Sequence, residues 1–171
     1  MTDVTYTRTG TIYNHLTGVL SMTITNELYA NIYPDVQQQL TAHERPATVP
    51  QGSRLLKYGV PSEELIIVNW GSAEVTVPVR GKNISLGIVG PGKVLGLRSV
   101  ICGEAPEVDV TCLEPCDITL LARDAFLEVL RRNPQMYFAV VKVLSSDLKK
   151  DHVVLRQKTG RLRNHAEHPR A

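Results

Sequence analysis

The chain has 171 residues, of which 43% are hydrophobic and 21% are charged, and its formal net charge is +2. This length suits one domain with a short appendage, and it can bury a core without disulfides or a structural metal. The near balance of basic and acidic residues excludes a strongly basic nucleic-acid-binding coat and an acidic solvating chain. No apolar run is long enough to span a bilayer, and the N-terminus shows no secretory signal. We therefore expect a globular cytoplasmic protein without a membrane segment.

The N-terminal part of the chain is predicted to form an arm followed by a helix. Residues 1–27 are rich in Thr and Tyr and have weak periodicity, so whether this arm contains a strand stays open. Pro34 can occupy the first turn of a helix, and Val36 and Leu40 would then share one face. The helix is expected to end at Arg45-Pro46, because the residue before a proline avoids helical geometry.

From about residue 49 to residue 121 the sequence predicts short strands separated by glycines. Apolar and polar residues alternate over residues 75–79, 84–88 and 108–112, which is typical of half-buried strands. Pro78 lies within the first of these segments and indicates an edge strand or a bulge. Closely spaced strands of this kind predict a β-sandwich, a jelly roll or a barrel.

After residue 121 the apolar period changes to that of helices. A short helix is predicted around residues 126–130, and Asn133-Pro134 has the pattern that begins a helix. A long helix is predicted over residues 134–160, with Gly160 as its stop, followed by a polar tail over residues 161–171.

The long helix carries an apolar stripe that we interpret as the seam of a homodimer. Its members follow one another at helical spacing and are Val141, Leu144, Leu148 and Leu155. Monomers usually avoid exposing a contiguous apolar patch of this size. An alternative stays open, in which the helix folds back and the stripe belongs to the core of the monomer.

A series of short motifs in a fixed order carries a family resemblance. The motifs are Val49-Pro50-Gln51-Gly52, Gly59, Leu65-Ile66-Ile67-Val68 ending at Gly71, Gly90 to Gly96, Val110 to Cys116, Asp124-Ala125-Phe126 and Asn133-Pro134. Together they resemble the cyclic-nucleotide-binding domain family, and in particular the effector domain of catabolite-activator-like (Crp/Fnr-type) regulators. The resemblance implies a mainly β fold with flanking helices (α+β). Its centre would be a jelly-roll-type β-roll over residues 28–133, followed by the long helix.

The same resemblance implies a ligand site, from which this sequence departs. In the family a phosphate-binding cassette follows the position of Gly96, where a glutamate meets the ribose and an arginine pairs with the cyclic phosphate. Leu97 takes the glutamate position here, and Pro106 or Glu107 takes the arginine position. Arg98 could compensate if it points inward, or it could be a solvated surface cation. The candidate ligand-binding positions are Gly96, Leu97, Arg98, Ser99, Pro106, Glu107 and Val108.

These departures decide the expected ligand and partner. Loss of the arginine removes a charge-assisted contact worth about 1.5–3 kcal/mol, so ordinary cyclic AMP binding is doubtful. Another small effector, or none, is expected, and no cofactor is predicted. Regulators of the family continue into a helix-turn-helix domain, but residues 161–171 are too few for one. We therefore expect a stand-alone sensor module without specific DNA binding.

Neither an enzyme nor a metal site is predicted. The sequence contains no P-loop, no nucleophile elbow and no zinc-protease motif. A cupin-like enzyme is the least favoured alternative, because the strands between Val49 and Leu121 contain no histidine. Cys102, Cys112 and Cys116 fit no ligand spacing and are interpreted as reduced structural thiols. The main alternative to a sensor is a structural or partner-binding homodimer with a vestigial pocket.

Overall fold

The computed structural model describes residues 4–6, 12–14, 26–79 and 81–146. Near the N-terminus, β1 (Val4–Tyr6) and β2 (Ile12–Asn14) form an antiparallel pair within the predicted arm. The C-terminal half of the predicted long helix and the whole polar tail lie outside the described residues.

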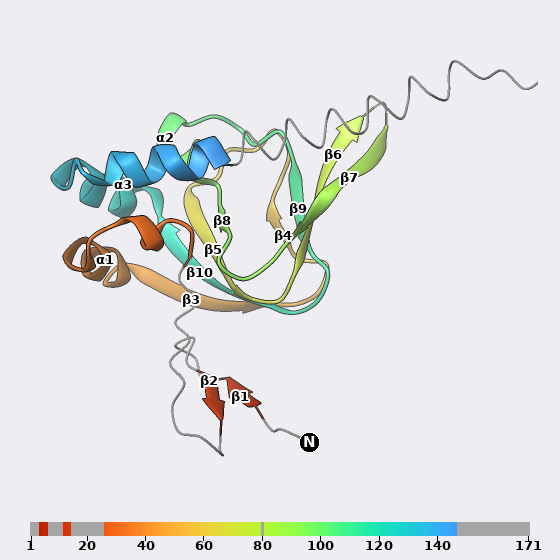
Figure 1. The fold of residues 1–171 in the computed structure, drawn as a ribbon. Coiled ribbons are helices and arrows are strands. Elements are labelled where there is room, and N and C mark those ends of the chain that lie inside the picture. The colour runs from red at the N-terminus through yellow and green to blue at the C-terminus, as the bar shows by residue number, and fades with distance from the viewer. Residues whose placement is uncertain (1–3, 7–11, 15–25, 80, 147–171) are drawn as a thin grey trace, which may run out of the picture.

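Strands dominate the fold from residue 26 onward, and the helices lie at one end of them (Figure 1). The elements are η1 (Tyr29–Asn31), α1 (Pro34–Thr41), β3 (Glu44–Val49), β4 (Arg54–Leu56), β5 (Glu64–Trp70), β6 (Ala73–Val79), β7 (Lys82–Val89), β8 (Val94–Leu95), α2 (Leu97–Cys102), β9 (Asp109–Cys112), β10 (Cys116–Ala122) and α3 (Arg123–Arg132). A last helix covers residues 136–146, up to the end of the described residues. The strands form two antiparallel four-stranded sheets, in the orders β3-β10-β5-β8 and β4-β9-β6-β7. The predicted mainly β roll with flanking helices is confirmed.

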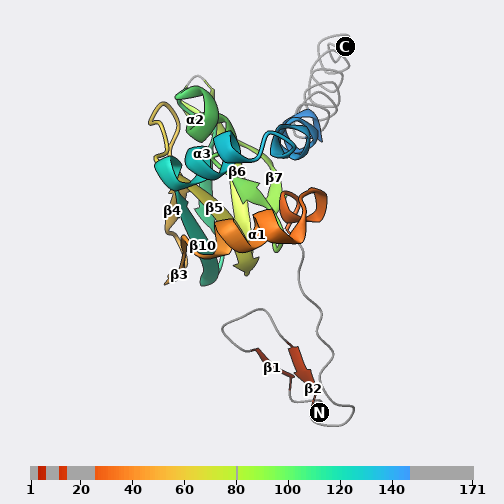
Figure 2. The same ribbon diagram turned by 90° about the vertical axis from the view of Figure 1, so that its left-hand side faces the viewer.

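Two hydrophobic clusters fill the molecule, and β5 separates them. The roll cluster lies between the sheets and includes Leu56, Ile66, Val68, Ala73, Leu95, Val110, Cys112, Cys116 and Ile118. The helix-side cluster joins the other face of β5 to the helices, which cover that end of the roll in Figure 2, and includes Leu40, Leu65, Ile67, Leu97, Val100, Phe126 and Met136. Burial on both faces explains why β5 has a continuous apolar run rather than an alternating one.

The environment of Pro78 agrees with the prediction of an edge or a bulge. β6 pairs with β7 along its whole length, but it pairs with β9 only from Ala73 to Thr76. The register of β6 against β7 also shifts between Val75 and Thr76. Pro78 therefore lies where β6 has a single neighbour, so its missing N–H disrupts no second ladder.

The helices begin close to where the sequence places them, but one predicted boundary is wrong. α1 begins at Pro34, and its inward residues Val36 and Leu40 are fully buried. It ends at Thr41, and Arg45-Pro46 lies inside β3 rather than at a helix end. No helix in the described part of the chain is long and apolar enough to cross a membrane.

Candidate ligand-binding site

Gly96 fixes the start of the cassette segment. Its φ is +80°, and a Cβ at this position would lie 2.9 Å from the carbonyl oxygen of Glu64. Both the backbone conformation and the close approach therefore require glycine. At the other end of α2, Gly103 has a φ of +72° and donates its N–H to the carbonyl of Ser99 at 2.8 Å. The short helix α2 is thus held between two left-handed glycines.

The first inward-facing residues of α2 do not offer free polar groups. Leu97 is 4% exposed and packs in the helix-side cluster. Ser99 is 2% exposed, and its hydroxyl donates to the carbonyl oxygen of Glu104 at 2.6 Å. Leu97 is therefore a core residue, and the hydroxyl of Ser99 is engaged within the segment.

Arg98 points to the surface and is engaged by a carboxylate. Its Nε and one terminal nitrogen lie 2.6 and 2.5 Å from Oε2 of Glu104, and 56% of its side chain is exposed. The hydrogen bond to Glu104 raises the pKa of Arg98 further above its ordinary value. In this arrangement Arg98 is a surface cation that is already paired with Glu104.

The far end of the segment is held by the turn that follows β4. The carbonyl of Pro106 accepts the N–H of Gly59 at 2.9 Å, and Oδ1 of Asp109 accepts the N–H of Tyr58 at 3.1 Å. Glu107 is exposed, while the neighbouring Val108 is half-buried against the roll cluster. Glu107 therefore places an exposed carboxylate at this end of the segment.

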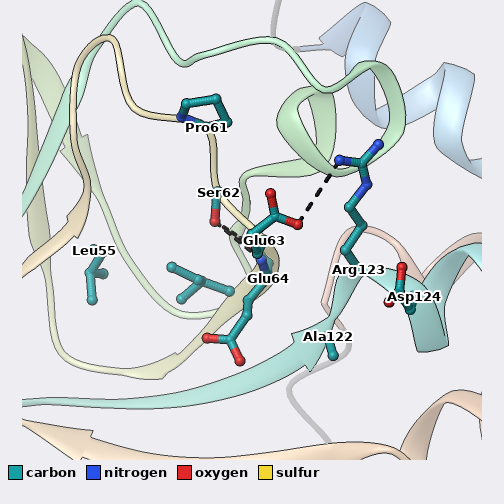
Figure 3. A pocket seen from close by; sticks show the side chains of 9 residues that line it. Leu55, Pro61, Ser62, Glu63, Glu64, Ala122, Arg123 and Asp124 are labelled. Atoms are coloured by element: carbon teal, nitrogen blue, oxygen red, sulfur yellow. Dashed lines mark hydrogen bonds and ion pairs between the residues drawn. The ribbon is translucent and has the colours of Figure 1, made fainter.

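A hollow of about 570 Å³ lies beside the cassette, at the start of β5 (Figure 3). It is lined by Leu55, Pro61, Ser62, Glu63, Glu64, Ile66, Ala122, Arg123 and Asp124. None of the predicted cassette positions lines it, although Ser62 borders Gly96, whose Cβ would lie 3.5 Å from the Ser62 hydroxyl. The Arg123 guanidinium and the Glu63 carboxylate approach to 4.0 Å across it. Sequence reasoning missed this pair, because no motif marks a contact between a strand start and a helix start.

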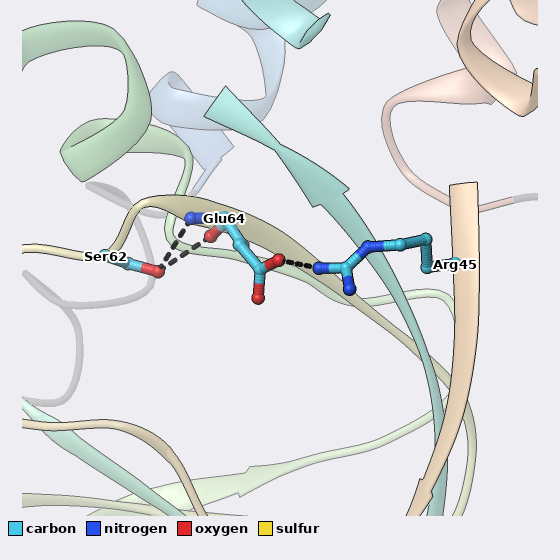
Figure 4. A network of polar contacts seen from close by, with 3 residues as sticks. All are labelled: Arg45, Ser62 and Glu64. Carbon is cyan, nitrogen blue, oxygen red and sulfur yellow. Dashed lines mark hydrogen bonds and ion pairs between the residues drawn. The ribbon is translucent and has the colours of Figure 1, made fainter. Parts of the chain in front are cut away.

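A polar network fixes the same end of β5 (Figure 4). The Ser62 hydroxyl donates to the Glu64 carbonyl at 2.7 Å and accepts the Glu64 N–H at 3.3 Å. The Glu64 carboxylate pairs with Arg45 of β3, across the intervening strand β10. These contacts hold the Glu64 backbone against which Gly96 packs.

The predicted seam residues have different environments. Val141 is 58% exposed, whereas Leu144 is half-buried against the helix-side cluster. Leu148 and Leu155 lie outside the described residues. The face of the last helix that packs on the roll is formed by Met136, Ala139, Val140 and Val143, and its outer face exposes Tyr137, Phe138 and Val141.

Metal-ligating side chains do not gather in the part of the chain that the structure describes. No group of three or more His, Cys, Asp or Glu residues is placed there to hold a metal ion. Cys112 and Cys116 are buried and Cys102 is exposed, and all three are free thiols.

Several solved structures have the same fold as this chain. The catabolite activator protein of Thermus thermophilus aligns with a TM-score of 0.68 at 19% identity, over 78% of this chain and 63% of that chain. A cyclic nucleotide-binding domain from Methylobacillus flagellatus aligns with a TM-score of 0.67 at 20% identity, over 74% of each chain. The sensor domain of a transcriptional regulator from Pseudomonas aeruginosa aligns with a TM-score of 0.58 at 15% identity, over 72% of this chain and 88% of that chain. At these identities the likeness establishes the fold.

The sequence identifies the family of the chain. No curated protein matches the sequence. The profile of the cyclic nucleotide-binding domain matches residues 46–133, which are just over half of the chain and include the cassette segment and α3. These residues also carry the left-handed glycines at Gly96 and Gly103. The chain belongs to the cyclic nucleotide-binding domain family.

Proposed function

We propose that the chain is a non-enzymatic regulatory module that binds a small effector in its β-roll and signals through the helix that begins at residue 136. The effector is a compound other than cyclic AMP or cyclic GMP. The observation that carries this proposal is the state of the cassette, residues 96–108, all of which the structure describes. Arg98 is paired on the surface with Glu104, Leu97 is part of the core, and Glu107 is an exposed negative charge.

The electrostatics of the cassette argue against a cyclic phosphate. A desolvated phosphate needs a cation, and a charge-assisted hydrogen bond contributes about 1.5–3 kcal/mol. Arg98 could serve only if it left Glu104 and turned inward. A carboxylate at Glu107 would add repulsion.

Titration calorimetry with cyclic AMP and cyclic GMP tests the proposal. The native chain is expected to bind neither nucleotide with micromolar affinity. Glu107→Arg is expected to raise the affinity for cyclic AMP about tenfold or more, from the value of one charged hydrogen bond. Glu128→Arg makes the same charge change on α3 and is expected to have no such effect. Micromolar binding of either nucleotide by the native chain would refute this choice of effector.

We also propose that the module is a homodimer that acts in the cytoplasm. The exposed apolar face of the last helix, Tyr137, Phe138 and Val141, supports the first part. The free thiols support the second.

A structural homodimer with a vestigial pocket is the second candidate. The internal hydrogen bond of Ser99 and the Arg98–Glu104 pair favour it, because they leave few cassette groups for a ligand. A thermal-shift screen against cyclic nucleotides and small acidic metabolites separates the two candidates. An effector present at a hundred times its Kd stabilises a protein by about 2.7 kcal/mol, whereas a vestigial pocket gives no shift.

A further inference from the structure

Residues 26–31, which contain η1, contact both the last helix and the strand that leads into the cassette. Asn26 is 6% exposed, and its Oδ1 accepts the N–H groups of Leu28 and Tyr29 at 3.1 and 2.8 Å. The side chains of Leu28 and Tyr29 are buried in the helix-side cluster. This short segment is therefore fixed to the body of the domain by its own turn and by two buried side chains.

At one end of the segment, Glu27 covers the open edge of β8. β8 is the last strand in the order β3-β10-β5-β8, so one of its edges has no neighbouring strand. The Glu27 carboxylate accepts the N–H of Val94 at 2.9 Å and lies 2.9 Å from Nζ of Lys93. The Glu27 N–H also donates to the carbonyl of Gly92 at 3.0 Å. A side chain from residues 26–31 thus gives an N–H at the sheet edge the partner that such a group needs.

At the other end of the segment, Asn31 contacts the last helix. Nζ of Lys142 donates to Oδ1 of Asn31 at 2.6 Å, and Nδ2 of Asn31 donates to the carbonyl of Glu27 at 3.0 Å. A continuous series of polar contacts therefore runs from Lys142 through Asn31 and Glu27 to Val94. Val94 lies two residues before Gly96, where the cassette begins.

We propose that residues 26–31 couple the position of the last helix to the entry of the cassette. When the helix moves away, the Lys142–Asn31 contact breaks, Glu27 is held less firmly, and the Val94 N–H loses its partner. Because such coupling is reciprocal, a change at the entry of the cassette shifts the helix by the same route. As a means of regulation this rests on the proposed function, but the coupling itself does not depend on any effector.

Hydrogen exchange at single amides of the folded chain, followed by NMR without an effector, tests the coupling. Glu27→Ala removes the acceptor and is expected to raise the exchange rate of the Val94 amide about tenfold or more, from the value of one hydrogen bond to a charged group. Glu27→Gln keeps a side-chain oxygen and is expected to retain much of the protection. Lys142→Met is expected to raise the same rate about threefold, because the Lys142–Asn31 contact is exposed and therefore weaker.

A double variant and a matched control separate coupling from two independent effects. Glu27→Ala combined with Lys142→Met is expected to exchange no faster at Val94 than Glu27→Ala alone, because Lys142 acts on Val94 through Glu27. Lys82→Met removes the same charge from the exposed start of β7 and is expected to leave the Val94 amide unchanged.

Three results would overturn the proposal. The first is a Val94 amide that is unchanged in Lys142→Met, and the second is a double variant whose increase equals the product of the two single increases. The third is an equal increase at an amide in the middle of β10, such as that of Ile118, which would report general destabilisation. None of these results bears on effector binding, and a chain that binds no effector would still show the coupling.

Discussion

Gly71 is the residue at which backbone conformation and packing constrain the fold together. Its φ is +89°, and a Cβ would lie 2.7 Å from the Cys116 sulfur and 2.8 Å from the Pro115 carbonyl oxygen. Gly59 has a similar φ of +72°, but no atom lies within 4 Å of the position of its Cβ. Gly59 is therefore required only by its backbone conformation, whereas Gly71 is required both by its conformation and by the close packing around it.

Substitution of these two glycines by alanine should have unequal effects. Both variants place a Cβ in the left-handed region, which costs about 1–2 kcal/mol. Gly71→Ala should lose a further 1–3 kcal/mol or so, because the turn between β9 and β10 must move to admit the methyl group. Urea denaturation of both variants measures the difference. Equal losses of stability in the two variants would show that the turn between β9 and β10 is not tightly packed against Gly71.

Residue-scale features of the cassette were only partly predictable. From the sequence, Pro106 or Glu107 is predicted to take the arginine position of the family, and this stays a prediction. The direction of Arg98 is not visible, since its partner Glu104 lies across the C-terminal end of α2. The Glu63–Arg123 contact was not predictable either, because it joins residues that are distant in the sequence.

At the scale of elements, one buried and one exposed polar contact join α2 to the turn that follows it. Ser99 joins the middle of the helix to the carbonyl of Glu104 in the following turn, and it is 2% exposed. The Arg98–Glu104 pair joins the same two segments, but both side chains are more than half exposed. Exposed ion pairs contribute little, whereas a buried group that loses its partner is costly.

Ser99→Ala should therefore destabilise the protein by about 1–2 kcal/mol and increase amide hydrogen exchange in residues 103–107. Arg98→Ala on the same helix is the control, and it should change stability by less than about 0.5 kcal/mol. Denaturant unfolding and hydrogen-exchange mass spectrometry measure both effects. A larger loss in Arg98→Ala than in Ser99→Ala would contradict this order.

Elements with a strong apolar period were predicted, and short or irregular ones were missed. The runs that form β6, β7 and α3 are long enough for their periods to be recognised. β3 was missed because Arg45-Pro46 has the composition of a helix end, and only its pairing with β10 makes this segment a strand. β8 has two residues and α2 has six, so neither contains a full period.

For the whole molecule, the last helix has two apolar faces with different roles. Its inner face packs on the helix-side cluster through Met136, Ala139 and Val140. Its outer face exposes Phe138 and Val141, at 74% and 58%. One roll can cover only one of these faces, so the second is available to another copy of the chain.

Light scattering coupled to size-exclusion chromatography should therefore show a dimer for the native chain. Phe138→Asp should give a folded monomer, because a carboxylate buried in the interface without a partner costs several kcal/mol. Tyr33→Asp, which changes a 65% exposed aromatic residue at the start of α1, should remain a dimer. A native chain that is monomeric at high concentration would rule out the dimer.

Successive side chains of β5 face the two clusters in turn, and this determines how the stability effects of mutations combine. Ile66 faces the roll cluster and Ile67 faces the helix-side cluster, although they are adjacent in the chain. Their effects on stability should therefore be closer to additive than those of two residues in one cluster, because their side chains belong to different clusters. Ile66 should instead be non-additive with residues such as Ile118, fifty-two positions away but in the same cluster. In this strand, the stability effects of adjacent residues are therefore expected to be nearly independent, whereas the effects of residues far apart in the sequence are expected to be coupled.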